Sequence, residues 1–214
     1  MKKLPIAIPG NCFNHKSYIK SHPPTGLLAT RHGDRLIAIP EVLLRSIPKT
    51  LREEAGEASY LALYTFGESW GKSFCDRVLQ DIYQYYRQPV LDTIASEFFV
   101  SIESAWAVHG LGKPSIDFSL SHRGLLIVSI SHSGISEGQT IEQDATARSF
   151  SLESGFLAGW FSMLTGQKLR ACASNWESAP DSLQFLVGTV ARIEKIETSF
   201  LKKGQIERSM LATL

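Results

Sequence analysis

The sequence predicts an α+β domain in which an antiparallel sheet, built from hairpins, is covered by helices. Two hairpin patterns alternate with pairs of helical patterns along the chain, and this alternation is typical of an antiparallel sheet with helices packed on it. The 214 residues fit one domain, and a hydrophobic share of 43% with a charged share of 20% is enough for a buried core. We therefore expect an N-terminal arm over residues 1–25 and a single domain over residues 26–214.

Proline and glycine mark the first segments. Four prolines among scattered polar residues predict that residues 1–25 form an extended arm on the domain or a partly ordered tail. Two apolar runs on either side of Arg31–Asp34, a segment that contains a glycine, predict a first hairpin. A short helix is then expected over Glu41–Ser46, because Pro48 follows it.

The strongest helical pattern runs from Thr50 to about Arg87. Thr50 is expected to cap this helix, with Glu53 three residues later completing a capping box. A second amphipathic helix is expected from Leu91 to His109. The buried face of the first helix is predicted from apolar residues that recur every three or four positions: Leu63, Phe66, Trp70, Phe74, Val78 and Ile82.

The second half of the chain alternates between strand and helix patterns. It contains short apolar runs that predict another hairpin and two further strands. It also contains two segments in which apolar residues recur with the period of a helix. One of these helices is expected to end at Gly166, a residue suited to a helix C-terminus. The expected elements are strands at 116–121, 125–131, 169–175 and 182–188 and helices at about 150–165 and 191–201.

Charge, cysteine spacing and hydropathy argue against a nucleic-acid-binding, a disulfide-bonded and a membrane-spanning protein. A net charge of +1 gives no nucleic-acid signature, and three widely spaced cysteines without a CxxC pair give no disulfide framework. No apolar run reaches the roughly 18–20 residues that span a bilayer. We expect a cytoplasmic protein, and the excess of basic residues within positions 1–50 also allows contact with a membrane surface or an acidic partner.

Catalytic motifs are missing from the sequence. The segment GESWGKS at 67–73 is one residue too short for a phosphate-binding loop. It also matches GxSxG, but Ser69 would lie in the middle of the long helix instead of at the strand-to-helix turn that exposes a nucleophile. The histidines lack the i, i+4 spacing of a helical metal site, and no nicotinamide, flavin or iron–sulfur motif is present. We expect no catalytic residue and no metal.

Two helical segments, GESWGKSF at 67–74 and ESGFLAGWF at 153–161, combine glycines with large aromatic residues. Glycine within a helix costs about 1 kcal/mol relative to alanine, so it usually marks a close approach to the backbone. That approach is either to another helix or to a ligand, and the sequence leaves both alternatives open. For the ligand alternative, the candidate binding residues are Trp70, Gly71, Phe74, Cys75, Gly155, Phe156, Gly159 and Trp160.

The second of these segments also carries a family resemblance. Residues 152–188 resemble the C-terminal core of 4-vinyl reductase domains, in which a helix of the form E-x-G-F-x-x-G ends at a glycine and precedes two strands. Upstream, RHGDRLIAIPEVLL and YTFGESWGKSF resemble the N-terminal half of the photosynthesis-linked members. The family core is expected at about 148–190. The matching residues are Glu153, Gly155, Phe156, Gly159, Gly166 and Phe185.

The resemblance implies a binding protein. Related domains occur in TRAPP vesicle-tethering subunits and phenol-responsive regulators, which implies an antiparallel sheet with helices, dimerisation and small-molecule binding. We expect a non-catalytic binding protein for an apolar molecule, foremost a non-covalently bound tetrapyrrole such as a bilin or a chlorophyll-type pigment or precursor. It would act as a carrier or assembly factor in photosynthesis. The implied partners are a second copy or a related protein of the same family, and a membrane protein under assembly.

Two alternatives to a pigment-binding protein stay open. The first is a dimerising structural or assembly protein without a ligand. The second is an accessory subunit of a vinyl-group reductase that uses a partner's electrons, since the chain has no redox motif of its own.

The resemblance does not extend to a zinc site. Phenol-sensing members hold zinc with Glu and Cys residues near the final two strands, and here Cys172, Asn175 and Leu183 stand at or near those positions. Leucine cannot bind zinc, and asparagine is a poor ligand compared with a thiolate. We therefore expect no zinc.

Overall fold

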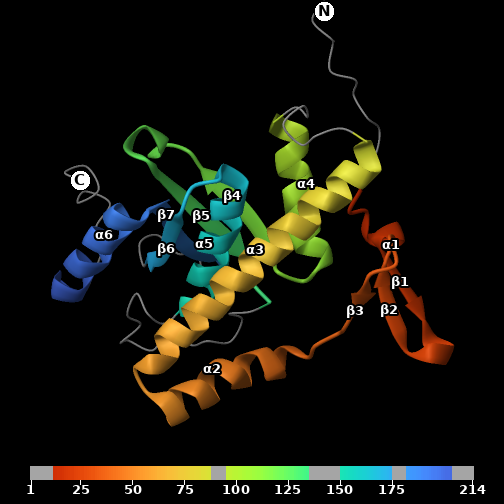
Figure 1. The fold of residues 1–214 in the computed structure, drawn as a ribbon, viewed down its shortest axis with the longest axis horizontal. Helices are drawn as coiled ribbons and strands as arrows, with labels where there is room; N and C mark the ends of the chain where they lie inside the picture. The colour runs from red at the N-terminus through yellow and green to blue at the C-terminus, as the bar shows by residue number, and fades with distance from the viewer. Residues whose placement is uncertain (1–11, 88–94, 135–149, 175–181, 204–214) are drawn as a thin grey trace, which may run out of the picture.

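Two antiparallel sheets with helices packed on them make up the described residues, 12–87, 95–134, 150–174 and 182–203, of this computed structural model (Figure 1). This architecture confirms the predicted α+β class. The elements in chain order are α1 (His15–Tyr18), β1 (Ile19–His22), η1 (Pro23–Thr25), β2 (Leu27–Thr30), β3 (Arg35–Leu36), α2 (Glu41–Ala55), α3 (Ala58–Tyr86), α4 (Ala95–Val108), β4 (Lys113–Asp117), η3 (Ser121–Arg123), β5 (Leu125–Ser131), α5 (Ser151–Thr165), β6 (Leu169–Ser174), β7 (Ser182–Thr189) and α6 (Val190–Lys203), where η denotes a 3-10 helix.

The larger sheet has the strand order β4-β5-β7-β6, and every neighbouring pair is antiparallel. Its side chains alternate between two apolar clusters. Phe185 and Val187 of β7 belong to the main core with α5, whereas Leu186 between them packs with residues of α6. Helices therefore cover both faces of this sheet, which explains why β5 and β7 are nearly continuous apolar runs.

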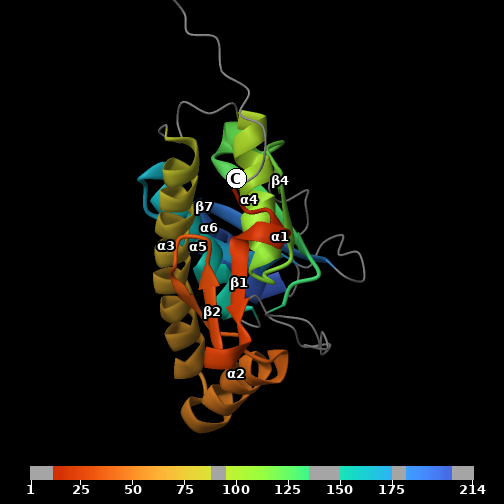
Figure 2. The ribbon, with the colours of Figure 1, turned by 90° about the vertical axis from the view of Figure 1, so that its right-hand side faces the viewer.

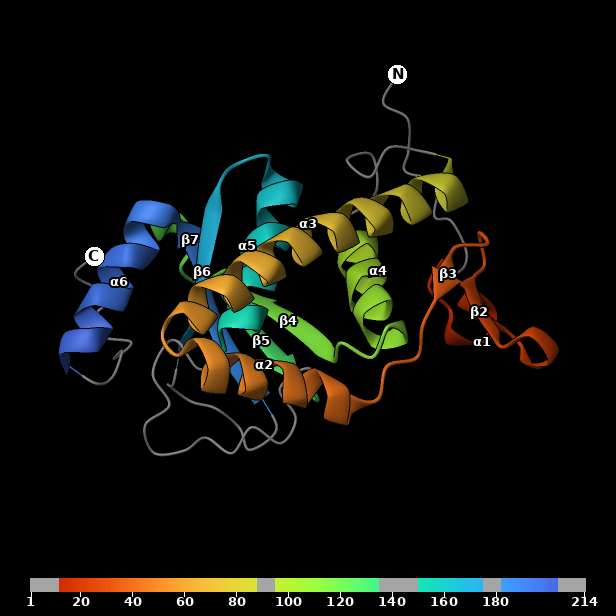
Figure 3. The ribbon, with the colours of Figure 1, turned by 60° about the horizontal axis from the view of Figure 1, so that its bottom comes forward.

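The main core is built in layers of sheet and helix. α5 lies between the larger sheet and α3, with α4 beside it and α6 on the opposite face of the sheet (Figures 1 and 3). Residues 151–161 of α5 are all buried. A helix that contacts a sheet on one side and another helix on the other needs an apolar surface all round, and α5 has one.

Residues 12–36, here called the N-terminal unit, form a small sheet beside the C-terminal end of α3 (Figures 2 and 3). The hairpin of β2 and β3 confirms the prediction around residues 31–34. The extended arm is wrong for residues 12–25, because β1 pairs with β2 from Ile19 opposite Thr30 onward. Gly26, at φ 66°, follows η1 and reverses the chain, so the prolines before it mark a turn between strands.

The helix boundaries of the first half differ from the prediction. α2 continues through Pro48 instead of ending before it, because a missing amide donor removes one hydrogen bond from a helix that is otherwise intact. The break falls at Gly56, whose φ of 53° cannot continue a right-handed helix. Thr50 therefore lies inside α2, and the predicted capping box with Glu53 is wrong.

The buried face of α3 includes its glycines. Leu63 and Ile82 are buried as predicted, but Phe66 is 63% exposed, so its assignment to the core is wrong. Gly67 and Gly71 are buried instead, because α5 lies directly against them. The period of apolar residues alone therefore placed the face slightly off its true position.

The elements of the second half are confirmed, with shifted ends. They are the β4–β5 hairpin, α5 with Gly166 at its C-terminus, the strands β6 and β7, and α6. The second predicted helix is α4, and its expected start at Leu91 lies outside the described residues. Within the described part of the chain, none of the helices has both the length and the apolar composition needed to cross a membrane.

Candidate functional site

The aromatic residues predicted from the two glycine-containing segments come together where α3 crosses α5. Trp70 and Phe74 of α3 contact Phe156 of α5, with ring centroids 4.7 and 5.7 Å apart. The ring of Phe74 also lies 5.4 Å from that of Trp160. The fold thus joins residues from both segments in one cluster.

The glycines of these segments form the closest part of the helix crossing. A Cβ at Gly71 would lie 2.8 Å from the carbonyl carbon of Phe156, and one at Gly155 would lie 2.8 Å from that of Tyr64. A Cβ at Gly159 would likewise overlap the backbone of α3. The opposing backbone occupies the space that a ligand would need, so these three glycines serve helix packing. For Gly71, Gly155 and Gly159, the predicted contact with a ligand is therefore wrong.

Cys75 lies on the same side of α3 and is fully buried. Burial raises the pKa of its thiol to about 12. At neutral pH the thiol is protonated and therefore a poor nucleophile. A ligand at this crossing is thus expected to bind without a covalent bond to Cys75.

Three residues that sequence reasoning missed extend the cluster. The indole of Trp106 on α4 lies 5.2 Å from the ring of Phe156. His109, directly after α4, lies 5.0 Å from Phe74 and 5.4 Å from Tyr18 of the N-terminal unit. The spacing of three residues between Trp106 and His109 on an apolar helix is the signal that could have found them. The aromatic site is defined here as Tyr18, Phe74, Trp106, His109, Phe156 and Trp160.

Two ring nitrogens supply polar chemistry to the aromatic site. Nε1 of Trp106 is buried and has no hydrogen-bond partner among the described residues, although buried indole N–H groups usually find one. Nδ1 of His109 lies 2.7 Å from the carbonyl oxygen of Ala105, so Nδ1 carries the hydrogen and Nε2 is an acceptor. Burial lowers the pKa of His109, and its imidazole is therefore neutral at pH 7.

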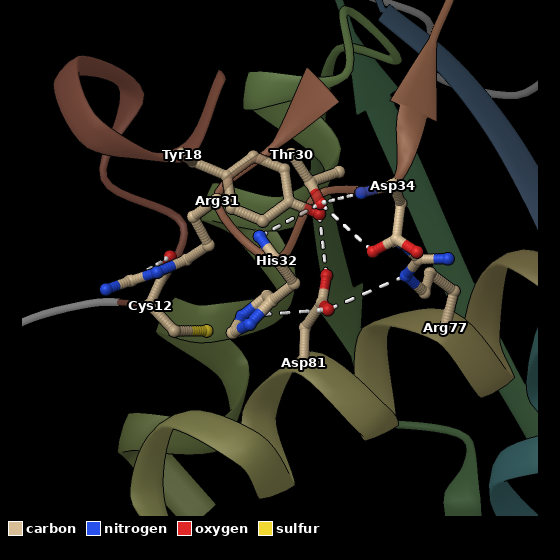
Figure 4. A network of polar contacts seen from close by, with 8 residues as sticks. All are labelled: Cys12, Tyr18, Thr30, Arg31, His32, Asp34, Arg77 and Asp81. Atoms are coloured by element: carbon tan, nitrogen blue, oxygen red, sulfur yellow. Dashed lines mark hydrogen bonds and ion pairs between the residues drawn. The ribbon is translucent and has the colours of Figure 1, made fainter. Parts of the chain in front are cut away.

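A buried carboxylate lies beside the aromatic site (Figure 4). Oδ2 of Asp81 on α3 accepts a hydrogen bond of 2.6 Å from the hydroxyl of Tyr18. Oδ1 lies 3.6 Å from Nε of Arg77 and 3.9 Å from Nε2 of His32. Burial, and then the hydrogen bond to Asp81, raise the pKa of Tyr18, so its hydroxyl stays protonated and donates to Asp81 at neutral pH.

Within the described residues, no group of three or more His, Cys, Asp or Glu side chains is placed to hold a metal ion. Cys172 lies in β6 and Leu183 in β7, while Asn175 lies outside the described part of the chain. Ser69 lies exposed within α3 and not at a strand-to-helix turn, as the sequence predicts.

Known proteins resemble this chain in fold and not in sequence. No protein-family model matches the chain, and no curated protein matches it. The phenol-responsive sensory domain of the transcription activator PoxR, solved with phenol, is similar with a TM-score of 0.56 and 13% identity over 92% of this chain and 96% of that one. This similarity shows a shared fold.

Two further solved structures are similar at lower TM-scores. One is a trafficking protein particle complex subunit 3 from Naegleria fowleri, covalently bound to palmitic acid, with a TM-score of 0.46 and 13% identity over 69% of this chain and 93% of that one. The other is a vinyl-4-reductase family protein from Methanocaldococcus jannaschii, with a TM-score of 0.42 and 14% identity over 72% of this chain and 84% of that one.

Proposed function

We propose that this chain is a binding module for a small, mainly apolar molecule with one hydroxyl group, held in the aromatic site. The observation that carries the proposal is the unpartnered Nε1 of Trp106, one helical turn from the neutral imidazole of His109. A ligand hydroxyl can accept a hydrogen bond from Trp106 and donate one to Nε2 of His109. The apolar part of the ligand would lie against the aromatic rings, as in most small-molecule sites.

The fold comparison supports this class of ligand. The sensory domain of PoxR, which shares the fold, was solved with phenol, an aromatic ring with one hydroxyl. The hydroxyl of phenol carries the donor and the acceptor that the two nitrogens require. Phenol is therefore the probe that we choose for testing the proposal.

A tetrapyrrole is the larger ligand that the family resemblance implies. It needs a broad flat apolar surface, and the glycines that would provide one on α3 and α5 are covered by the opposing helix. This geometry favours a single-ring ligand over a tetrapyrrole. A role as pigment carrier or assembly factor in photosynthesis requires that the chain binds a tetrapyrrole. The absorption spectrum of the protein purified from its native host distinguishes the two ligands, because a bound tetrapyrrole absorbs visible light and a simple phenol does not.

Trp106→Phe is expected to weaken phenol binding roughly tenfold to a hundredfold, because it removes the indole N–H and keeps an aromatic ring. Toluene has the ring of phenol without the hydroxyl, so its affinity should change little. Isothermal titration calorimetry with both molecules measures the difference.

Trp70→Phe is the matched control for this experiment. Trp70 packs on the ring of Phe156 from a partly exposed position and takes no part in the pair of polar nitrogens. The control should keep the preference for phenol over toluene. Equal affinities of the wild type for the two molecules, or no binding of either, would contradict the proposed function.

Exposed apolar residues favour a second candidate function, the docking of a second copy of the chain. Val42, Leu43 and Ile47 of α2 and Leu61 and Phe66 of α3 are between 45% and 72% exposed. Exposed apolar side chains that are contiguous on a surface commonly mark a protein interface. The family resemblance implies dimerisation, and a symmetric dimer is the commonest assembly of soluble proteins.

Phe66→Glu is expected to weaken such a dimer about tenfold or more, because it places a charge in an apolar interface. Light scattering over a series of protein concentrations measures the shift toward monomer. Tyr83→Glu is the control, since Tyr83 is an exposed aromatic residue near the other end of α3. A wild-type protein that is monomeric at every concentration would refute self-association.

A further inference from the structure

The polar contacts between the N-terminal unit and the rest of the molecule lie along one stripe of α3. Arg77, Asp81 and Tyr85 follow one another at intervals of four residues and so lie on one face of the last turns of this helix. Each of them meets the unit. Tyr18 donates its hydrogen bond to Asp81, and the guanidinium of Arg31 lies over the ring of Tyr85, 4.6 Å from its centroid.

Asp81 is the centre of this attachment (Figure 4). A carboxylate that is 1% exposed needs polar partners to offset its loss of water. Two of its partners, Tyr18 and His32, belong to the unit. The third, Arg77, comes from α3 itself and also forms an ion pair with Asp34 of the unit. One shared group of charges therefore joins the two parts.

The unit also covers the aromatic site. Phe13 and Tyr18 are buried, with ring centroids 5.1 Å apart, and both belong to the main core. Tyr18 makes an edge contact with the ring of His109 while its hydroxyl donates to Asp81. The same side chain thus closes the site with its ring and fastens the unit with its hydroxyl.

A short exposed segment joins the unit to α2. Residues 37–40 have no regular secondary structure, and all four are exposed. They lead to α2, which in turn connects to the opposite end of α3 (Figure 3). The unit can therefore leave its place on α3 without unfolding α2 or the larger sheet.

We propose that the N-terminal unit is a gate over the aromatic site, held closed by the charges around Asp81 and opened to admit and release a ligand. This inference rests on the proposed function, because a gate needs a binding site behind it. Opening breaks the contacts of Tyr18 with Asp81 and with His109 together. The unit therefore detaches from α3 and the aromatic site becomes accessible in a single step.

Hydrogen exchange of the ligand-free protein tests the gate without any ligand. The amides of β1 and β2 should exchange faster than those of β7, because the unit opens more often than the larger sheet unfolds. Asp81→Asn removes the charge and keeps the shape, and it should speed exchange in β1 and β2 roughly tenfold while β7 stays unchanged. Asp34→Asn weakens the ion pair with Arg77 and the hydrogen bond that Asp34 Oδ2 accepts from the Thr30 hydroxyl. It leaves Asp81 in place, so it is the milder second variant and should give a smaller increase in the same strands.

Glu197→Gln is the matched control for both variants. It breaks the ion pair between Glu197 and Arg170, which joins α6 to β6 at the other end of the molecule, and should leave β1 and β2 unaffected. The gate is overturned if the unit and β7 exchange at one common rate and shift together in the Asp81 and Asp34 variants. Such a result would make the unit an integral part of the core.

Stopped-flow binding of phenol then tests whether the unit controls access. Asp81→Asn should raise the association and the dissociation rate constants of phenol by a similar factor, about tenfold, because the gate opens more often. Rate constants equal to those of the wild type would overturn the gate even if β1 and β2 exchange quickly.

A wrong proposed function and a wrong gate give different experimental results. If phenol binds neither protein, the proposed function is wrong, and acrylamide quenching of tryptophan fluorescence then reports whether opening of the unit exposes the aromatic site. Stronger quenching in Asp81→Asn than in Glu197→Gln would uphold the opening of the unit. Quenching at the wild-type level would overturn it.

Discussion

Replacing Gly71 with leucine is expected to lower the melting temperature by roughly 10 °C, although leucine has the higher helix propensity by about 1 kcal/mol. Even a Cβ at this position would overlap the carbonyl oxygen of Phe156. Backbone cannot move aside as a flexible side chain can, so α3 and α5 would have to separate. Overpacking of this kind costs about 3 kcal/mol. Thermal unfolding followed by circular dichroism measures the change.

Two companion variants show that the effect belongs to the helix crossing. Ala62→Leu adds a larger side chain to an exposed position on the same helix and should leave the melting temperature nearly unchanged. Gly71→Ala adds only the Cβ and should give an intermediate loss. A melting temperature that stays the same or rises in Gly71→Leu would mean that there is space at this position, and it would restore the ligand alternative for the glycines.

Above pH 9 the protein is expected to lose stability steeply, by about 4 kcal/mol per pH unit, because three buried thiols would have to ionise. Cys12, Cys75 and Cys172 are all buried. Burial raises the pKa of Cys12 and Cys75 to about 12, and it also raises that of Cys172. Thiols of the unfolded chain ionise near pH 9. The stabilisation is therefore fully present below pH 9 and is lost as the pH rises toward about 12.

Urea unfolding between about pH 8 and pH 11, in the presence of a reductant, measures this loss. Each single replacement of Cys12, Cys75 or Cys172 by alanine should reduce the slope of the unfolding free energy against pH by about a third, since each thiol contributes about 1.4 kcal/mol per pH unit. Tyr18 and Tyr64 add to the slope above pH 10, because burial raises the pKa of both phenols. Cysteine variants that keep the slope of the wild type would contradict the assignment.

The sequence predicted elements best where local signals and tertiary packing agree. The β4–β5 hairpin and α5 with its terminal Gly166 were recognisable because turn residues and apolar period point to the same structure. At Pro48 the local signal and the folded structure disagree. Proline predicts the end of a helix, yet α2 continues through it to Ala55. Phe66 was misplaced because an aromatic residue counts as apolar in a pattern, while the true contact face of α3 has glycines that no apolar pattern includes.

The aromatic site was predictable only in part. Phe74 and Phe156 were found because glycine inside a helix is a local anomaly that draws attention to its neighbours. Tyr18 and Trp106 belong to other segments, and the distances that bring them to the site arise only from the tertiary fold. One clue was local: Asp81 is a carboxylate within the apolar face of a helix, a position that requires a polar partner from elsewhere in the chain.

The order in which the larger sheet is made has a consequence for synthesis in the cell. β7 is its last strand along the chain, yet it occupies the inner position and joins β5 to β6. Until residues up to Thr189 have left the ribosome, β5 and β6 both present unpaired edges, and apolar edges of this kind promote aggregation. Pairing between strands so distant in the chain also slows folding. A nascent chain that stalls before β7 therefore lacks more than one strand, because its sheet consists of two separate pieces.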